Sequence, residues 1–192
     1  AVTGRMIRTV GASETIARVL ADEVPPRPDG DTWQRRLAPR IDLAQTRRVL
    51  AETERPGMRV LIPGDAEWPA GVDALGDGAP VALWAKGDTG LLSRPVWDRL
   101  TVTGARASTA YGEHATTELV QSAVADSRVV FSGGAYGIDG AAHRAALASD
   151  GSTVAVLAGG LDRPYPAGHT ELLGRVGKDG LLLSELPPGA AP

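Results

Sequence analysis

The chain has 192 residues, 43% of them apolar, which suits one packed domain of ordinary size or one domain with a small appendage. It has no cysteine, so disulfides, thiolate zinc sites and a cysteine nucleophile are excluded, and no run approaches the ~20 apolar residues of a membrane span. The net charge is −3. Residues 1–100 contain 14 basic and 14 acidic residues, and residues 101–192 contain 6 basic and 9 acidic residues. A site for a polyanion must therefore be formed by a few local groups and not by the overall charge.

The first 56 residues are expected to form a small helical region. Apolar residues between positions 10 and 20 recur at helical spacing, with Ser13 and Glu14 as start signals, and a second helix is expected over 41–54. A proline-rich loop over 24–31 separates them, and Pro56-Gly57 is expected to end the second helix. Because the chain does not begin with Met, we expect this region to be incomplete, and no motif in it indicates a function.

Residues 57–192 are expected to form an α/β core with a Rossmann-like parallel sheet. Short apolar strands alternate with helices, which favours a parallel sheet with helices on both faces. The expected strands lie at 59–63, 81–85, 100–103, 128–132, 153–157 and 181–184. The expected helices lie at 110–126, 138–149 and 169–176. Ser108 and Thr109 are candidate caps of the first of these helices.

Glycines follow three successive strands of this core. Gly104, Gly133 and Gly159 each come directly after or at the end of an expected strand. In an open parallel sheet, ligands bind outside the carboxyl ends of the strands. We therefore expect the three glycine corners to meet at one edge and to form a site there.

The segment from Ser132 to Asp139 is the strongest single motif. Glycine lets the backbone turn sharply and approach a ligand closely, and the helix that follows offers free N–H groups to an anion. The candidate phosphate-binding residues of this segment are Ser132, Gly133, Gly134, Ala135 and Gly137. A tight strand-to-helix turn with glycines for packing alone is the alternative. Neither G-x-G-x-x-G nor a P-loop is present, so neither a dinucleotide cofactor nor P-loop hydrolysis is indicated.

Two arginines and a tyrosine complete the candidate site. Arg106 lies two residues after Gly104, where its planar guanidinium suits a phosphate, and Arg163 is a second candidate. Tyr165 can stack on a base. The alternatives are solvated surface arginines and a tyrosine that anchors its loop to the core.

The histidines do not suggest catalysis or metal binding. His114, His143 and His169 lie on separate elements without a carboxylate at metal-ligand spacing, so no metal site is predicted. His143 follows Asp139 by four residues, and a hydrogen bond within the helix is the expected explanation. Because no acid/base pair stands out, the sequence does not indicate an enzyme.

Several of these motifs together resemble one protein family. The segments are 102–106, 111–112, 132–139, 142–143, 154–162, 165–166 and 184–189, with 65–69 before them. In their order and spacing they resemble the DNA-processing protein A family, also called DprA or Smf. The resemblance implies an extended Rossmann-like fold whose C-terminal part would be missing here.

The resemblance also implies a function and a set of site residues. It implies cytoplasmic binding of single-stranded DNA, protection of the incoming strand, homodimerisation, and help in loading the RecA recombinase during natural transformation, with no catalysis, no cofactor and no membrane. Arg106 matches the phosphate-binding arginine, and the residues named from Ser132 to Gly137 match the phosphate-cradling loop. The segment 161–166, with Leu161, matches a loop that flanks the strand, and His169 lies where many members carry Asn.

Two other functions remain open at the level of sequence. Related Rossmann-like families include phosphoribohydrolases, which act on free nucleotides. Their Pro-Gly-Gly-x-Gly-Thr-x-x-Glu segment is not found here. The third alternative is a protein-interaction scaffold whose loops bind neither DNA nor nucleotides.

Overall fold

The computed structural model describes residues 2–23, 30–54 and 57–192. The chain divides into two compact units, one of Ala1–Leu50 with Ala70–Val81 and one of Ala51–Pro69 with Ala82–Pro192. The helix end predicted at Pro56 lies outside the described residues. The sequence predicted a boundary near residue 56 between the helical region and the α/β core. In the structure, Ala70–Val81 also belongs to the helical unit. Asp77 of that segment accepts hydrogen bonds from Arg5 and Arg8.

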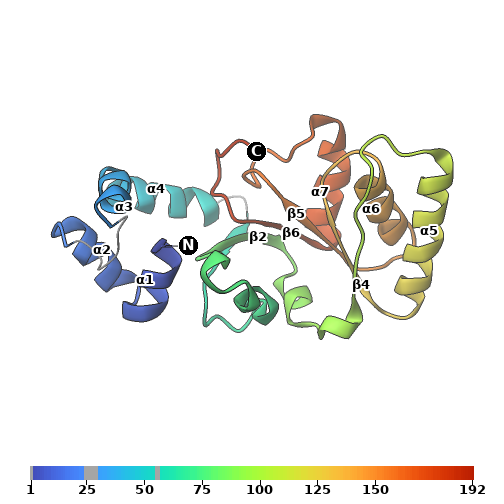
Figure 1. Cartoon of the computed structure of the whole chain (residues 1–192). Helices are drawn as coiled ribbons and strands as arrows, with labels where there is room; N and C mark the ends of the chain where they lie inside the picture. Colours follow the sequence, from blue (N-terminus) through green and yellow to red (C-terminus); the bar gives the residue numbers. More distant parts are fainter. Residues whose placement is uncertain (1, 24–29, 55–56) are drawn as a thin grey trace. The chain divides into compact units, whose positions relative to one another are not determined.

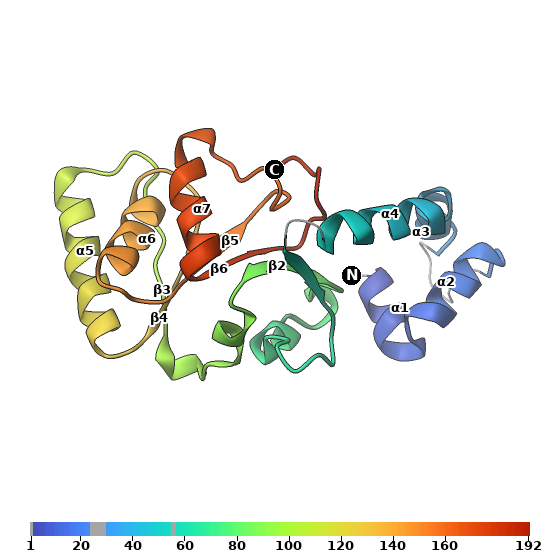
Figure 2. The ribbon, with the colours of Figure 1, turned by 180° about the vertical axis from the view of Figure 1, so that it is seen from behind.

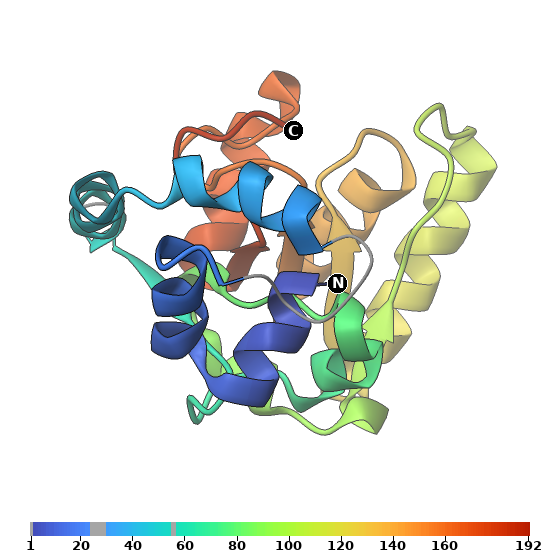
Figure 3. The ribbon, with the colours of Figure 1, turned by 60° about the vertical axis from the view of Figure 1, so that its left-hand side comes forward.

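The first unit is helical, as expected, but it contains more helices than the sequence indicated. Its elements are α1 (Val2–Val10), α2 (Ala12–Leu20), α3 (Gly30–Leu37), η1 (Ala38–Arg40), the first part of α4 (Leu43–Glu54) and η2 (Ala70–Gly78). The dark blue helices α1 and α2 are separate and meet at Gly11 (Figure 3). Gly11 has φ +87°, which a helix cannot contain, so one continuous helix is interrupted there.

The second unit is built on a six-stranded mixed sheet in the order β1-β2-β6-β5-β4-β3. The strands are β1 (Met58–Leu61), β2 (Leu83–Gly87), β3 (Arg99–Thr101), β4 (Val129–Gly133), β5 (Thr153–Leu157) and β6 (Leu181–Ser184). The four strands from β3 to β6 are parallel, as predicted, and the α/β Rossmann-like class is confirmed. β2 runs antiparallel to both β1 and β6. A parallel neighbour is usually reached through a crossover α-helix, and the connection from β1 to β2 contains no α-helix, only the 3-10 turns of η2.

Three helices connect the parallel strands and form one layer. They are α5 (Ala110–Ala125), α6 (Ile138–Ala148) and α7 (Thr170–Asp179), and α6 packs against both of the others. Figures 1 and 2 show them side by side. The sequence predicted helices on both faces, but here each new strand is added on the same side of the previous one. Right-handed crossovers then place all three helices on one face.

The core between this layer and the sheet is aliphatic. One cluster contains Leu161, Leu173 and Leu182, and a second contains Val120 and Val130, all at most 1% exposed. Short turns η3 (Thr89–Ser93), η4 (Val96–Asp98) and η5 (Ala167–His169) complete the unit. The packed helix layer fixes where each strand ends, and therefore where the loops at the carboxyl edge lie.

Candidate functional site

The loops after β3, β4 and β5 meet in one cleft at the carboxyl edge of the sheet. The cleft has a volume of about 280 Å³, close to the ~300 Å³ at the lower end of small-ligand pockets. Its lining residues are Arg106, Gly133, Gly134, Ala135, Tyr136, Asp139, Val156, Leu157, Ala158, Gly159, Tyr165, Pro166 and Pro192. The predicted convergence of the glycine corners is thus confirmed for the loops of β4 and β5, with Arg106 supplied by the loop after β3.

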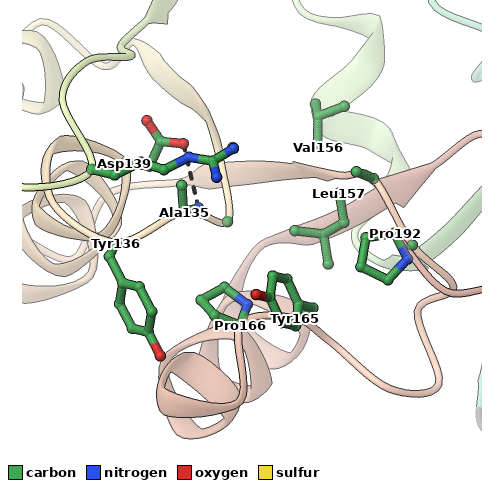
Figure 4. A pocket seen from close by; sticks show the side chains of 13 residues that line it. Ala135, Tyr136, Asp139, Val156, Leu157, Tyr165, Pro166 and Pro192 are labelled. Carbon is green, nitrogen blue, oxygen red and sulfur yellow. Dashed lines mark hydrogen bonds between the residues drawn. The ribbon is translucent and has the colours of Figure 1, made fainter.

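One wall of the cleft is apolar and partly aromatic. Figure 4 shows Tyr165 beside Leu157 and Pro192, with Ala135 and Asp139 on another side. Tyr165 is 63% exposed and Tyr136 is 48% exposed, so both rings are available to a ligand. This combination of a backbone loop, one arginine and exposed rings suits a ligand with both phosphate and base character.

The segment from Gly133 to Gly137, called the glycine loop below, is tightly packed against the loop that carries Arg106. Gly137 has φ +76°, and a Cβ there would lie 2.1 Å from the carbonyl oxygen of Ala105. The N–H of Ile138 donates to the same oxygen at 3.2 Å. Only glycine fits at this position, and the contact holds the backbone of Arg106 at the start of α6.

Two buried histidines bind the carbonyl groups of the glycine loop. His143 Nε2 lies 2.8 Å from the Gly133 oxygen, and His169 Nδ1 lies 3.1 Å from the Gly134 oxygen. The expected bond between His143 and Asp139 within the helix is therefore wrong, since His143 reaches Gly133 and, through Nδ1, Thr153 Oγ1 at 2.8 Å. Burial lowers the pKa of His143, which favours the neutral ring, and because the Gly133 carbonyl can only accept, Nε2 is the nitrogen that donates to it.

Two N–H groups of the glycine loop have no acceptor among the described residues. They are those of Tyr136 and Gly137, whereas the ladder pair of Gly133 with Val156 directs the Gly134 N–H toward the Val156 oxygen. The N–H of Ala135 makes one long bond of 3.4 Å to Asp139 Oδ2. Asp139 Oδ1 is buried without a partner among the described residues. The loop therefore offers N–H donors to an anion. The carboxylate of Asp139 lies beside these donors and would repel the same anion.

Five of the predicted site residues line the cleft, and the others lie around it. Those in the cleft are Arg106, Gly133, Gly134, Ala135 and Tyr165. The hydroxyl of Ser132 is buried and donates to the Val102 oxygen at 2.6 Å, so it faces away from the cleft. Leu161 and His169 are buried, and the side chain of Arg163 is 91% exposed beside Asp162. A Cβ on Gly104 would lie 2.8 Å from Ile138, so this glycine permits close packing.

The sequence did not single out several residues that line the cleft. Tyr136 and Asp139 were inside the quoted motif and could have been found there. Val156, Leu157 and Pro192 carried no local signal, because an apolar residue at a strand end and a proline in a loop are usual in any α/β protein. No group of three His, Cys, Asp or Glu residues that could hold a metal is found in the part of the chain that the structure describes.

The family model of DNA recombination-mediator protein A matches residues 59–192. The chain belongs to this family. A putative DNA processing protein DprA of Mycobacterium tuberculosis strain H37Rv is 42% identical over 97% of this chain and 49% of its own length. DNA processing protein DprA of Bacillus subtilis is 34% identical over 76% of this chain and 48% of its own length. The chain thus spans about half the length of these DNA recombination-mediator relatives.

Solved structures of this DNA recombination-mediator family have the same fold. The X-ray structure of DNA processing protein A from Streptococcus pneumoniae superposes with a TM-score of 0.76 at 29% identity, over 99% of this chain and 62% of that one. The protein from Helicobacter pylori, studied for its single-stranded DNA binding mode, gives a TM-score of 0.61 at 28% identity, over 70% of this chain and 58% of that one. Within the described residues, no helix is long and apolar enough to cross a membrane.

Proposed function

We propose that this chain binds single-stranded DNA, with the sugar-phosphate backbone held in the cleft. The observation that carries the proposal is the set of glycine-loop N–H groups without an acceptor among the described residues, those of Tyr136 and Gly137, and the weakly bonded N–H of Ala135, together with the guanidinium of Arg106 in the cleft. Backbone N–H groups at a helix N-terminus and an arginine fork are the groups that bind phosphate in proteins. The net charge of −3 does not oppose this, because these donors act at short range.

Tyr165 and Tyr136 extend the site from phosphate to base. Each ring is partly exposed and lines the cleft, so a base can stack on it. Base stacking depends little on base identity, since every base has a π-face. We expect binding with little sequence preference. Arg163, whose side chain is 91% exposed and does not line the cleft, is proposed as a further phosphate contact along the strand.

The wider role proposed for the chain follows its relatives. Proteins named for DNA processing, and one studied for binding single-stranded DNA, support a role in DNA processing during natural transformation. We propose that the full-length protein acts in the cytoplasm as a homodimer, protects incoming single strands and helps load the RecA recombinase. The proposal includes no chemical reaction and no cofactor.

The test measures binding of a fluorescein-labelled dT20 oligonucleotide by fluorescence anisotropy over a range of salt concentrations. Arg106→Ala should weaken binding about tenfold or more, because a charge-assisted hydrogen bond contributes ~1.5–3 kcal/mol. The slope of log affinity against log salt should fall by about one unit. Arg175→Ala is the matched control, since it removes the same charge from an exposed position of α7 outside the cleft.

Two results would contradict the proposal. One is an Arg106→Ala chain that binds dT20 as tightly as the parent. The other is release of free base from nucleoside monophosphates incubated with the chain and separated by chromatography, which would support a phosphoribohydrolase-like enzyme.

A further inference from the structure

The orientation of the peptide group between Gly134 and Ala135 is not fixed by the sheet, because the last ladder pair of β4 is Gly133 with Val156. Gly133 and Gly134 are consecutive glycines, and glycine adopts positive and negative φ about equally well. The peptide plane that follows Gly134, which lies beyond the ladder, can therefore rotate at little cost. A loop of this kind can present either its N–H groups or its carbonyl oxygens to the cleft, and only the first arrangement attracts a phosphate.

Two buried histidines bind the carbonyl oxygens of the glycine loop. His143 Nε2 binds the Gly133 oxygen and His169 Nδ1 binds the Gly134 oxygen, and neither ring lines the cleft. In a planar trans peptide the N–H points opposite to the carbonyl. We infer that His143 and His169 are positioning residues: His143 holds the Gly133 carbonyl at the end of β4, and His169 holds the Gly134 carbonyl inward so that the N–H of Ala135 faces the phosphate.

The surroundings of both rings are built to keep them in place. His143 is 0% exposed and bonded through Nδ1 to Thr153 Oγ1. The ring of His169 meets the Tyr136 ring edge-on, with centroids 4.8 Å apart. On its other side His169 lies against α6 at Gly140, where a Cβ would be 2.5 Å from His169 Cε1. The glycine in the first turns of α6 thus leaves the space that the imidazole occupies.

Removing a histidine donor would leave a buried carbonyl without a partner, which is unfavourable. The nearest remedy is rotation of the flexible peptide, which turns the carbonyl oxygen toward the cleft. That oxygen would then repel a phosphate at the place where an N–H had attracted it. The expected result is a folded chain with weakened DNA binding.

The first test compares two substitutions at one position. His169→Asn keeps a nitrogen donor at the δ position, and His169→Leu has none. For binding of labelled dT20, His169→Leu should lose about tenfold in affinity at a temperature where circular dichroism shows it folded, while His169→Asn should stay within about threefold of the parent. His143→Gln, which places an amide nitrogen near the ε position, and His143→Leu form a second pair with the same expectation.

The second test moves the His169 ring without changing it. Gly140→Ala places a methyl group 2.5 Å from His169 Cε1, so the ring must shift relative to the Gly134 oxygen, and dT20 affinity should fall several-fold at a temperature where circular dichroism shows the variant folded. Gly174→Ala is the matched control, because it lies in the interior of α7 with open space around the added methyl group. The amide signals of Gly134 and Ala135 in a ¹⁵N-labelled chain should move in Gly140→Ala and in His169→Leu but stay near their parent positions in His169→Asn.

The amide signals separate this inference from the proposed function on which its binding measurement rests. If Arg106→Ala weakens dT20 binding but the Leu and Asn variants of His169 bind alike, only the positioning role is wrong. If the parent does not bind dT20, the proposed function fails, and the amide signals still decide the positioning role. Unmoved signals of Gly134 and Ala135 in both His169→Leu and Gly140→Ala would overturn it.

Discussion

Replacing Gly137 by Ala should damage both the stability of the chain and its candidate site. The backbone of Gly137 has φ +76° and ψ −128°, a conformation that costs a residue with a side chain ~1–3 kcal/mol. The added Cβ would also lie 2.1 Å from the Ala105 oxygen and 2.7 Å from the Arg106 oxygen, and both are backbone atoms that cannot rotate away. The loop must shift, and the bond from Ile138 N–H to Ala105 is lost, at a cost of ~1 kcal/mol.

Together these effects predict a loss of ~2–4 kcal/mol in the free energy of unfolding, a large part of the ~5–15 kcal/mol usual for a folded protein. Urea denaturation followed by circular dichroism measures it. Gly174→Ala is the control, because an alanine in open space inside a helix should leave stability unchanged or raise it by up to ~1 kcal/mol. Binding of dT20 by Gly137→Ala should also weaken, since the loop that carries Arg106 is displaced.

Parent-like stability in Gly137→Ala would refute this reasoning about the tight contact between the two loops. Parent-like dT20 affinity in a destabilised Gly137→Ala would refute a narrower point. It would mean that the position of the Arg106 loop does not matter for binding.

Three further predictions follow from burial and exposure. Tyr165→Ala should weaken dT20 binding by ~1–3 kcal/mol with little change in stability, whereas Tyr111→Ala, 80% exposed but outside the cleft, should do neither. Leu182→Ala should lower the free energy of unfolding by ~2–5 kcal/mol in urea denaturation, because this side chain is 1% exposed in the core. Burial lowers the pKa of His143, so below about pH 6.5 this histidine binds a proton in the unfolded chain before it does in the folded chain. The free energy of unfolding should therefore fall as the pH drops from 7.5 to 5. It should fall less in His143→Gln.

The sequence alone was sufficient for the features that depend on neighbouring residues. The strand at β5 (Thr153–Leu157) and the start of α6 at Ile138 were predicted at the positions observed, because an apolar run and a glycine turn act locally. Thr109 caps α5 by accepting from Gly112 N–H at 3.1 Å, as its type and position indicated. The convergence of the glycine corners followed from topology, since parallel strands end at the same edge.

Features that depend on distant residues were decided by the tertiary structure. The sequence could not show that Ser132 faces the core, because a strand buried on both faces has no alternation to read. It likewise did not indicate that β1 and β2 run antiparallel, or that a methyl group on Gly140 would meet an imidazole.

The glycine loop illustrates this division. Its glycines and its place between strand and helix are visible in the sequence, because backbone freedom is a property of the residues themselves. Its Gly133 and Gly134 carbonyls are bound by His143, ten residues away, and by His169, 35 residues away. Only the packing of α6 and η5 against the sheet brings those donors into contact with the loop, so the donor face that this protein presents to a ligand is decided in three dimensions.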